Sequence, residues 1–131
     1  MALIIDVEKR NEAISTVKLE GQLDNNTYRQ FETKMASVMT PHMKGIILDL
    51  AKLDYISSAG LRVILTIQKN FGKNNAVFTL INLQPQIKKV FDIANALPDT
   101  PIFTSMEEAD AYFDAMQKKV IDEQKEKEGS A

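Results

Sequence analysis

The sequence predicts an α/β domain built on a mixed sheet of about five strands, with an N-terminal antiparallel hairpin and about four helices. Near the N-terminus, apolar and polar side chains alternate with the period of strands around one polar turn. Further on, apolar strand-like runs alternate with segments of helical period, which is typical of parallel crossovers. The 131 residues suffice for one domain, and none is a cysteine, which excludes disulfides and cysteine metal sites.

The first part of the chain is predicted to form the hairpin and one helix. Residues 3–8 and 13–20 alternate with the period of strands, with Leu3, Ile5 and Val7 on one face of the first and Ala13, Ser15, Val17 and Leu19 on one face of the second. The polar residues 9–12 form the turn between them. The Asp/Asn cluster at 24–26 offers side chains that can cap a helix, which ends before Pro41. The apolar face of this helix comprises Tyr28, Phe31, Met35 and Val38.

The middle of the chain is predicted to hold two buried strands around a second helix. Residues 45–50 are apolar with little alternation, as expected of a strand covered on both faces. The helix follows from about Ser58 to Phe71, and Gly72 suits its C-terminal cap. Residues 76–83 form the next, mostly apolar, strand.

The C-terminal part predicts two helices around one short strand. Pro85 suits the first position of a helix, Ile102–Phe103 is the short strand, and Ser105–Glu108 match a capping box that begins the last helix. The apolar faces of the two helices are Ile87, Val90, Phe91 and Ala94, and then Ala109, Tyr112, Phe113, Met116 and Val120. We therefore predict one domain over residues 1–121 and a polar tail over 122–131, either a fraying helix end or a disordered segment.

Two serines stand where the strand at 45–50 gives way to a helix. Unpaired N–H groups and the helix dipole at this point favour an anion, including a phosphate carried by Ser57 or Ser58. Because carboxyl ends of parallel strands meet at one edge, residues 24–27 and 55–60 are expected to form one surface with an exposed hydroxyl. The plain alternative is that the serines cap the helix and that Gly60 only permits close packing.

The residue inventory argues against an enzyme and against several partners. A serine nucleophile needs a base, and the single histidine, His42, lies in a loop after the first helix. No spacing matches a metal site or a phosphate-binding glycine loop, so we expect no metal and no cofactor. The net charge of −2, with both signs interleaved, argues against nucleic acid and anionic membranes. The N-terminal apolar run is too short for a signal peptide or membrane span, which predicts a cytoplasmic protein.

The stretch from Leu48 to Leu65 resembles the signature of STAS domains, above all the stand-alone bacterial anti-sigma-factor antagonists. Residues 21–24 together with Thr27 resemble the second landmark of that family, and the helix at 87–93 fits its place there. The resemblance covers residues 2–118 and implies a STAS-like mixed sheet.

The resemblance also implies a function in signalling and transcription regulation by partner switching. Such antagonists bind a serine kinase that is also an anti-sigma factor, are phosphorylated by it and released, and are reset by a metal-dependent serine phosphatase. The matching acceptor is Ser58; Ser57 stands where the family often has an acid and is the second candidate. The free protein is expected to be a monomer. The partner surface comprises Asp24, Asn25, Thr27, Tyr55, Ser57, Ser58, Ala59, Gly60, Leu61 and Arg62.

An alternative role is that of a non-phosphorylated STAS adaptor subunit of a lipid-transport ATPase. A capping hydroxyl fits that role equally well. A serine kinase or phosphatase gene beside this one favours the switch, and a transporter ATPase gene favours the adaptor.

Overall fold

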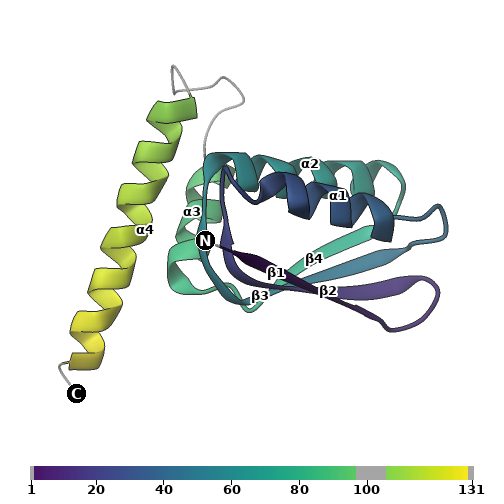
Figure 1. Ribbon diagram of the computed structural model, residues 1–131, viewed down its shortest axis with the longest axis horizontal. Helices are drawn as coiled ribbons and strands as arrows, with labels where there is room; N and C mark the ends of the chain where they lie inside the picture. The colour runs from purple at the N-terminus through teal and green to yellow at the C-terminus, as the bar shows by residue number, and fades with distance from the viewer. Residues whose placement is uncertain (1, 97–105, 130–131) are drawn as a thin grey trace.

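The computed structural model describes residues 2–96 and 106–129, which form one sheet with helices on one face and at one end. Figure 1 shows α1 and α2 over the same face of the sheet, and α4 standing beside α3 at one end. The elements are β1 (Leu3–Lys9), β2 (Ile14–Leu23), α1 (Tyr28–Val38), β3 (Gly45–Ile56), α2 (Ser58–Lys73), β4 (Val77–Ile81), α3 (Pro85–Ala96) and α4 (Met106–Gly129).

The described strands make one sheet in the order β1-β2-β3-β4. β1 pairs antiparallel with β2, whereas β2–β3 and β3–β4 are parallel pairs. The predicted mixed sheet and N-terminal hairpin are therefore confirmed. The strand predicted at Ile102–Phe103 lies outside the described residues.

The core lies between the sheet and the helices that cover it. Val17 and Leu19 of β2 and Leu48 of β3 are buried together with Phe31 of α1 and Ile64 of α2. Fully burying one such side chain contributes about 1.5–3 kcal/mol, so this layer fixes the register of the two central strands. That register decides which residues meet at the carboxyl ends of the strands.

β3 runs six residues further than the predicted strand at 45–50. β4 pairs only with the first part of β3, and side-chain amides take its place beyond that point. Gln84 Nε2 donates to the carbonyl of Ala51 at 3.0 Å, and Gln86 Nε2 donates to that of Asp54 at 3.0 Å. The sequence prediction stopped too early because polar residues interrupt the apolar run.

Two helix ends differ from the prediction. α2 continues through Gly72 to Lys73, and the left-handed residue after it is Asn75, with φ of 57°. The predicted cap at Gly72 is therefore wrong; asparagine tolerates this conformation because its short polar side chain can bond locally. α4 continues to Gly129, so residues 122–129 are helical, as expected of a Glu- and Lys-rich segment of high helix propensity. Over residues 2–96 and 106–129, no helix has both the length and the apolar character to cross a membrane.

Candidate functional site

The carboxyl ends of β2 and β3 lie side by side and carry the two segments that the sequence singled out. Leu23 is in register with Ile56, and the Ser57 N–H donates to the Leu23 carbonyl at 2.9 Å. The loop after β2 and the start of α2 therefore form one surface. This juxtaposition of residues 24–27 and 55–60 was predicted and is confirmed.

The loop after β2 is held by its own side chains. The Asp24 carboxylate accepts hydrogen bonds from the backbone N–H groups of Asn26 at 2.9 Å and of Thr27 at 3.1 Å. The Thr27 hydroxyl donates to the Gln22 carbonyl at 2.8 Å and accepts from the Asp24 N–H at 2.9 Å. Thr27, predicted to touch a partner, is buried and shapes the loop from within, whereas Asn25 is exposed.

Ser57 is the capping residue of α2. Its backbone is extended, and its hydroxyl accepts the Gly60 N–H at 3.2 Å. Gly60 must be glycine, because a Cβ there would lie 2.7 Å from Leu23 Cγ and 2.8 Å from the Leu23 carbonyl oxygen. The plain reading of helix capping and close packing thus holds for these two residues. Leu61 is buried as well, Ala59 is half-buried, and Arg62 is exposed.

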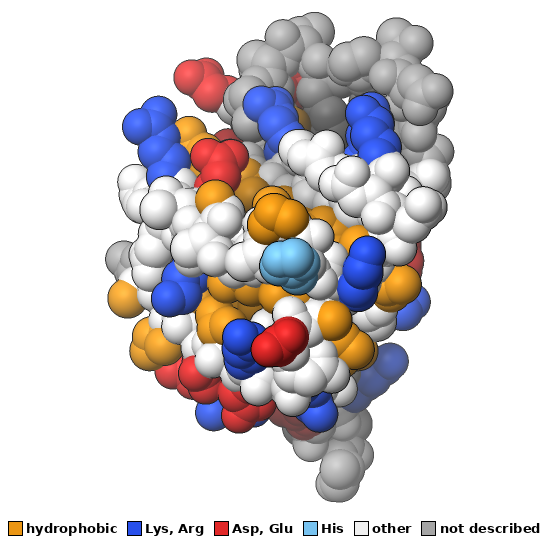
Figure 2. Space-filling model, turned by 90° about the vertical axis from the view of Figure 1, so that its right-hand side faces the viewer, with side chains coloured by type: hydrophobic (Ala, Val, Ile, Leu, Met, Phe, Trp, Pro, Cys, Tyr) orange, Lys and Arg blue, Asp and Glu red, His pale blue; other side chains and the backbone are white. Residues whose placement is uncertain are grey.

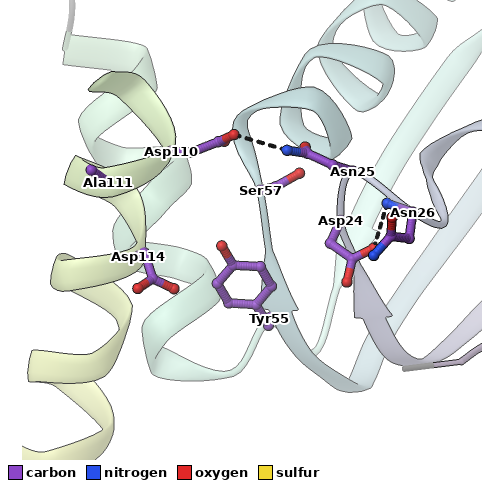
Figure 3. Close-up of a pocket in the computed structure, with 8 residues that line it drawn as sticks. All are labelled: Asp24, Asn25, Asn26, Tyr55, Ser57, Asp110, Ala111 and Asp114. Atoms are coloured by element: carbon purple, nitrogen blue, oxygen red, sulfur yellow. Dashed lines mark hydrogen bonds between the residues drawn. The ribbon is translucent and has the colours of Figure 1, made fainter. Parts of the chain in front are cut away.

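Ser58 is bound to a residue of α4. Its hydroxyl donates to Oδ1 of Asp110, and its N–H donates to the same oxygen at 2.9 Å. The other carboxylate oxygen of Asp110 accepts from Asn25 Nδ2 at 3.1 Å (Figure 3). Only 9% of Ser58 is exposed, so the prediction of an exposed hydroxyl is wrong: α4 covers it.

α4 is anchored to the end of β3 by Gln117, which is 1% exposed. Its Oε1 accepts the Ile56 N–H at 2.9 Å, and its Nε2 donates to the Ile56 carbonyl at 2.7 Å. Ala109 and Phe113 are buried beside it, but Tyr112 is 38% exposed, so its predicted place on the buried face is wrong. Sequence reasoning missed Asp110 and Gln117; their only signal was a helical spacing that puts both near Phe113.

The Asp110 carboxyl is held in its ionised form. Burial alone would raise its pKa, but hydrogen bonds from the Ser58 hydroxyl, the Asn25 amide and the Ser58 N–H outweigh burial and lower it. The N-terminus of α2 adds a favourable dipole at the same point. The Asp110 carboxylate is therefore an anion at the N-terminus of α2, the position that the sequence predicted to favour an anion.

Beside this contact lies an acidic hollow of about 410 Å³. Figure 3 shows the Tyr55 ring between the α4 side chains and the loop after β2. Burial and the nearby Asp114, Asp110 and Asp24 raise the pKa of Tyr55 to about 12, so its phenol stays protonated above the pH at which a free tyrosine ionises. The lining residues are Asp24, Asn25, Asn26, Tyr55, Ser57, Asp110, Ala111 and Asp114.

His42 is exposed and lies in the turn before β3, on the face shown in Figure 2. That turn precedes the amino end of β3, whereas Ser57 and Ser58 follow its carboxyl end. The single histidine of the chain is thus at the wrong end of the sheet to activate either serine. Within residues 2–96 and 106–129, no group of three or more acidic or histidine side chains is placed to hold a metal ion.

The family profile described as STAS domain matches residues 5–109. The chain belongs to the STAS domain family. One relative, "Putative anti-sigma factor antagonist BtrV" of Bordetella bronchiseptica, is 36% identical over 95 residues, which are 72% of this chain and 82% of that protein. The family match ends just before Asp110, so this residue and Gln117 lie beyond it.

Two solved structures share the fold of this STAS domain. The anti-sigma factor antagonist SpoIIAA in its unphosphorylated form superposes with a TM-score of 0.64 at 20% identity, covering 70% of this chain and 81% of that one. The Bacillus cell fate determinant SpoIIAA in its phosphorylated form gives 0.60 at 21% identity, covering 70% and 83%. At such identities the likeness establishes the fold alone.

Proposed function

We propose that this STAS domain is an anti-sigma-factor antagonist whose binding to a serine kinase is switched by phosphorylation of Ser58. One observation carries the proposal: of the two serines at the junction, only Ser58 has a hydroxyl that does not cap α2. The name of the Bordetella relative supports the antagonist role, and the two SpoIIAA structures share the fold on which that role would rest. The domain acts through its surface and has no catalytic role of its own.

In the proposed cycle the unphosphorylated domain binds a partner that is both serine kinase and anti-sigma factor. The kinase binds ATP and magnesium, transfers the phosphoryl group to Ser58 and releases the product. A metal-dependent serine phosphatase then restores the hydroxyl. The free domain is a cytoplasmic monomer in this cycle, and its partner surface comprises the exposed and half-buried residues around Ser58: Asp24, Asn25, Tyr55, Ala59 and Arg62.

The proposed release follows from charge. A phosphoserine carries about −1.5 to −2 charges at neutral pH, and here it would join the carboxylates of Asp24, Asp110 and Asp114. Pressing this dianion into a partner without a matched cation costs on the order of several kcal/mol. Because each ~1.4 kcal/mol is tenfold in affinity, a loss of a hundredfold or more is expected.

The assignment of Ser58 over Ser57 can be tested by mass spectrometry. Proteins that co-purify with the domain from its native cell are incubated with it and ATP. We expect Ser58→Ala to abolish incorporation, whereas the matched control Ser57→Ala, if it folds, keeps Ser58 as the phosphorylated residue. Phosphate only on Ser57, or on neither serine, contradicts the proposal.

One observation favours the alternative role as a non-phosphorylated adaptor of a lipid-transport ATPase. Ser58 is covered and its hydroxyl already has a partner in Asp110, which is what a purely structural serine would show. The same co-purification separates the two roles. Capture of a transporter ATPase without phosphate incorporation supports the adaptor, and capture of a kinase with incorporation supports the switch.

A further inference from the structure

We propose that α4 is an autoinhibitory latch: docked α4 closes over Ser58 through Asp110, and a phosphate on Ser58 opens it. The inference rests on the proposed function only in taking Ser58 as the modified residue. It concerns contacts of Asp110, a residue that lies just beyond the part of the chain that the STAS profile matches.

The closed state hides the acceptor. One carboxylate oxygen of Asp110 accepts hydrogen bonds from both the hydroxyl and the N–H of Ser58. The other oxygen accepts one from Asn25 in the loop after β2. Phosphoryl transfer forms a bond between Ser58 Oγ and the γ-phosphorus of ATP and breaks the bond from that phosphorus to the β–γ bridging oxygen. ADP leaves, and the hydroxyl proton passes to a general base of the kinase. Ser58 Oγ needs an open approach on the side that α4 now covers. The start of α4 must therefore leave before transfer.

The phosphorylated state cannot restore the same contact. Once esterified, Ser58 Oγ has no proton to donate, and the new dianion faces the Asp110 carboxylate, which like any ordinary aspartate is ionised at neutral pH. Both anions compete for the N–H groups at the start of α2. The phosphate is covalently fixed there, so Asp110 is the group that is displaced.

The second anchor limits how far the latch opens. Gln117 lies about two turns further along α4 and holds the Ile56 backbone through both of its amide atoms. Loss of the Asp110 contact alone therefore releases the first turns of α4, while Gln117 keeps the later part in place. Hydrogen exchange should then be fastest ahead of Gln117.

The test installs phosphoserine at position 58 during synthesis of the full chain, so no kinase is needed, and compares backbone hydrogen exchange with the unmodified chain. We expect amides of residues 110–116 to exchange about tenfold faster or more in the phosphorylated chain, with the β2 and β3 amides unchanged. Equal exchange in residues 110–116 of the two chains overturns the latch.

Two variants of the phosphorylated chain identify the cause. In Asp110→Asn the carboxylate becomes an amide that can donate to the phosphate, so phosphorylation should accelerate exchange less than twofold. Asp122→Asn makes the same change at an exposed site of α4 and should behave as the parent chain. If phosphorylation accelerates hydrogen exchange as much in Asp110→Asn as in the parent chain, repulsion from the Asp110 carboxylate is not the cause. Failure of a partner kinase to phosphorylate Ser58 would instead overturn the proposed function and leave this exchange result standing.

Discussion

Replacing Gln117 by leucine tests whether α4 is an integral part of the domain. Leucine keeps roughly the volume of the side chain but removes both polar atoms of its amide group, so the Ile56 N–H and carbonyl lose the hydrogen bonds of 2.9 and 2.7 Å that they now make. A buried backbone group left without a partner costs about 1–3 kcal/mol. For two groups with partial rehydration we expect a loss of about 2–4 kcal/mol in the free energy of unfolding.

Urea unfolding of the full chain measures this loss. With a slope of about 2 kcal/mol per molar, the midpoint should fall by about 1–2 M. The matched control is Gln124→Leu, the same substitution two turns further along α4 at a half-buried position, which should shift the midpoint by less than about 0.3 M. If Gln117→Leu unfolds at the same urea concentration as its control, α4 is not anchored as described. A lower urea midpoint in both variants would show that Gln124 also contributes to the stability of the domain.

Three further predictions address packing, ionisation and the end of α4. Gly60→Ala should destabilise the domain by about 1–3 kcal/mol through its clash with the neighbouring strand, whereas Gly72→Ala, with open space around it, should be neutral or gain up to about 1 kcal/mol; equal melting temperatures contradict this. Folding raises the pKa of Tyr55 to about 12, so the protonated phenol contributes fully to the free energy of unfolding below pH ~10, and this contribution is lost as the pH rises to about 12. Tyr55→Phe should therefore flatten the alkaline fall in stability; an unchanged dependence of stability on pH refutes this prediction. Truncation after Ile121 should leave the melting temperature within about 2 °C and partner binding unchanged, since six of the seven side chains described over residues 122–128 are exposed; a drop of many degrees would show that the removed segment docks.

Local pattern was enough to predict the sheet and the two segments that meet at its edge. Apolar residues at every second position specify the hairpin, and parallel strands bring residues 24–27 and 55–60 together whatever their side chains are. The N-terminus of α2 was predictable for the same reason, because Ser57 combines a preferred capping residue with a following helical period.

The cover over Ser58 was not predictable, because it depends on contacts between residues far apart in the chain. Asp110 looks like a solvated acid in the first turns of an amphipathic helix, and nothing near it in sequence points to Ser58. Gln117 looks like a polar interruption of an apolar face until its amide is placed against the end of β3. Both roles arise from how α4 docks, which the spacing of its apolar residues does not specify.

In the proposed cycle a phosphate on Ser58 switches partner binding, and isothermal titration measures this change in affinity directly. The kinase captured from the native cell is titrated with the unmodified chain and with the chain carrying phosphoserine at position 58. We predict that phosphorylation weakens the affinity at least a hundredfold, about 2.7 kcal/mol, while Ser58→Ala binds like the unmodified chain. Affinities of the two chains within threefold of each other would contradict the account.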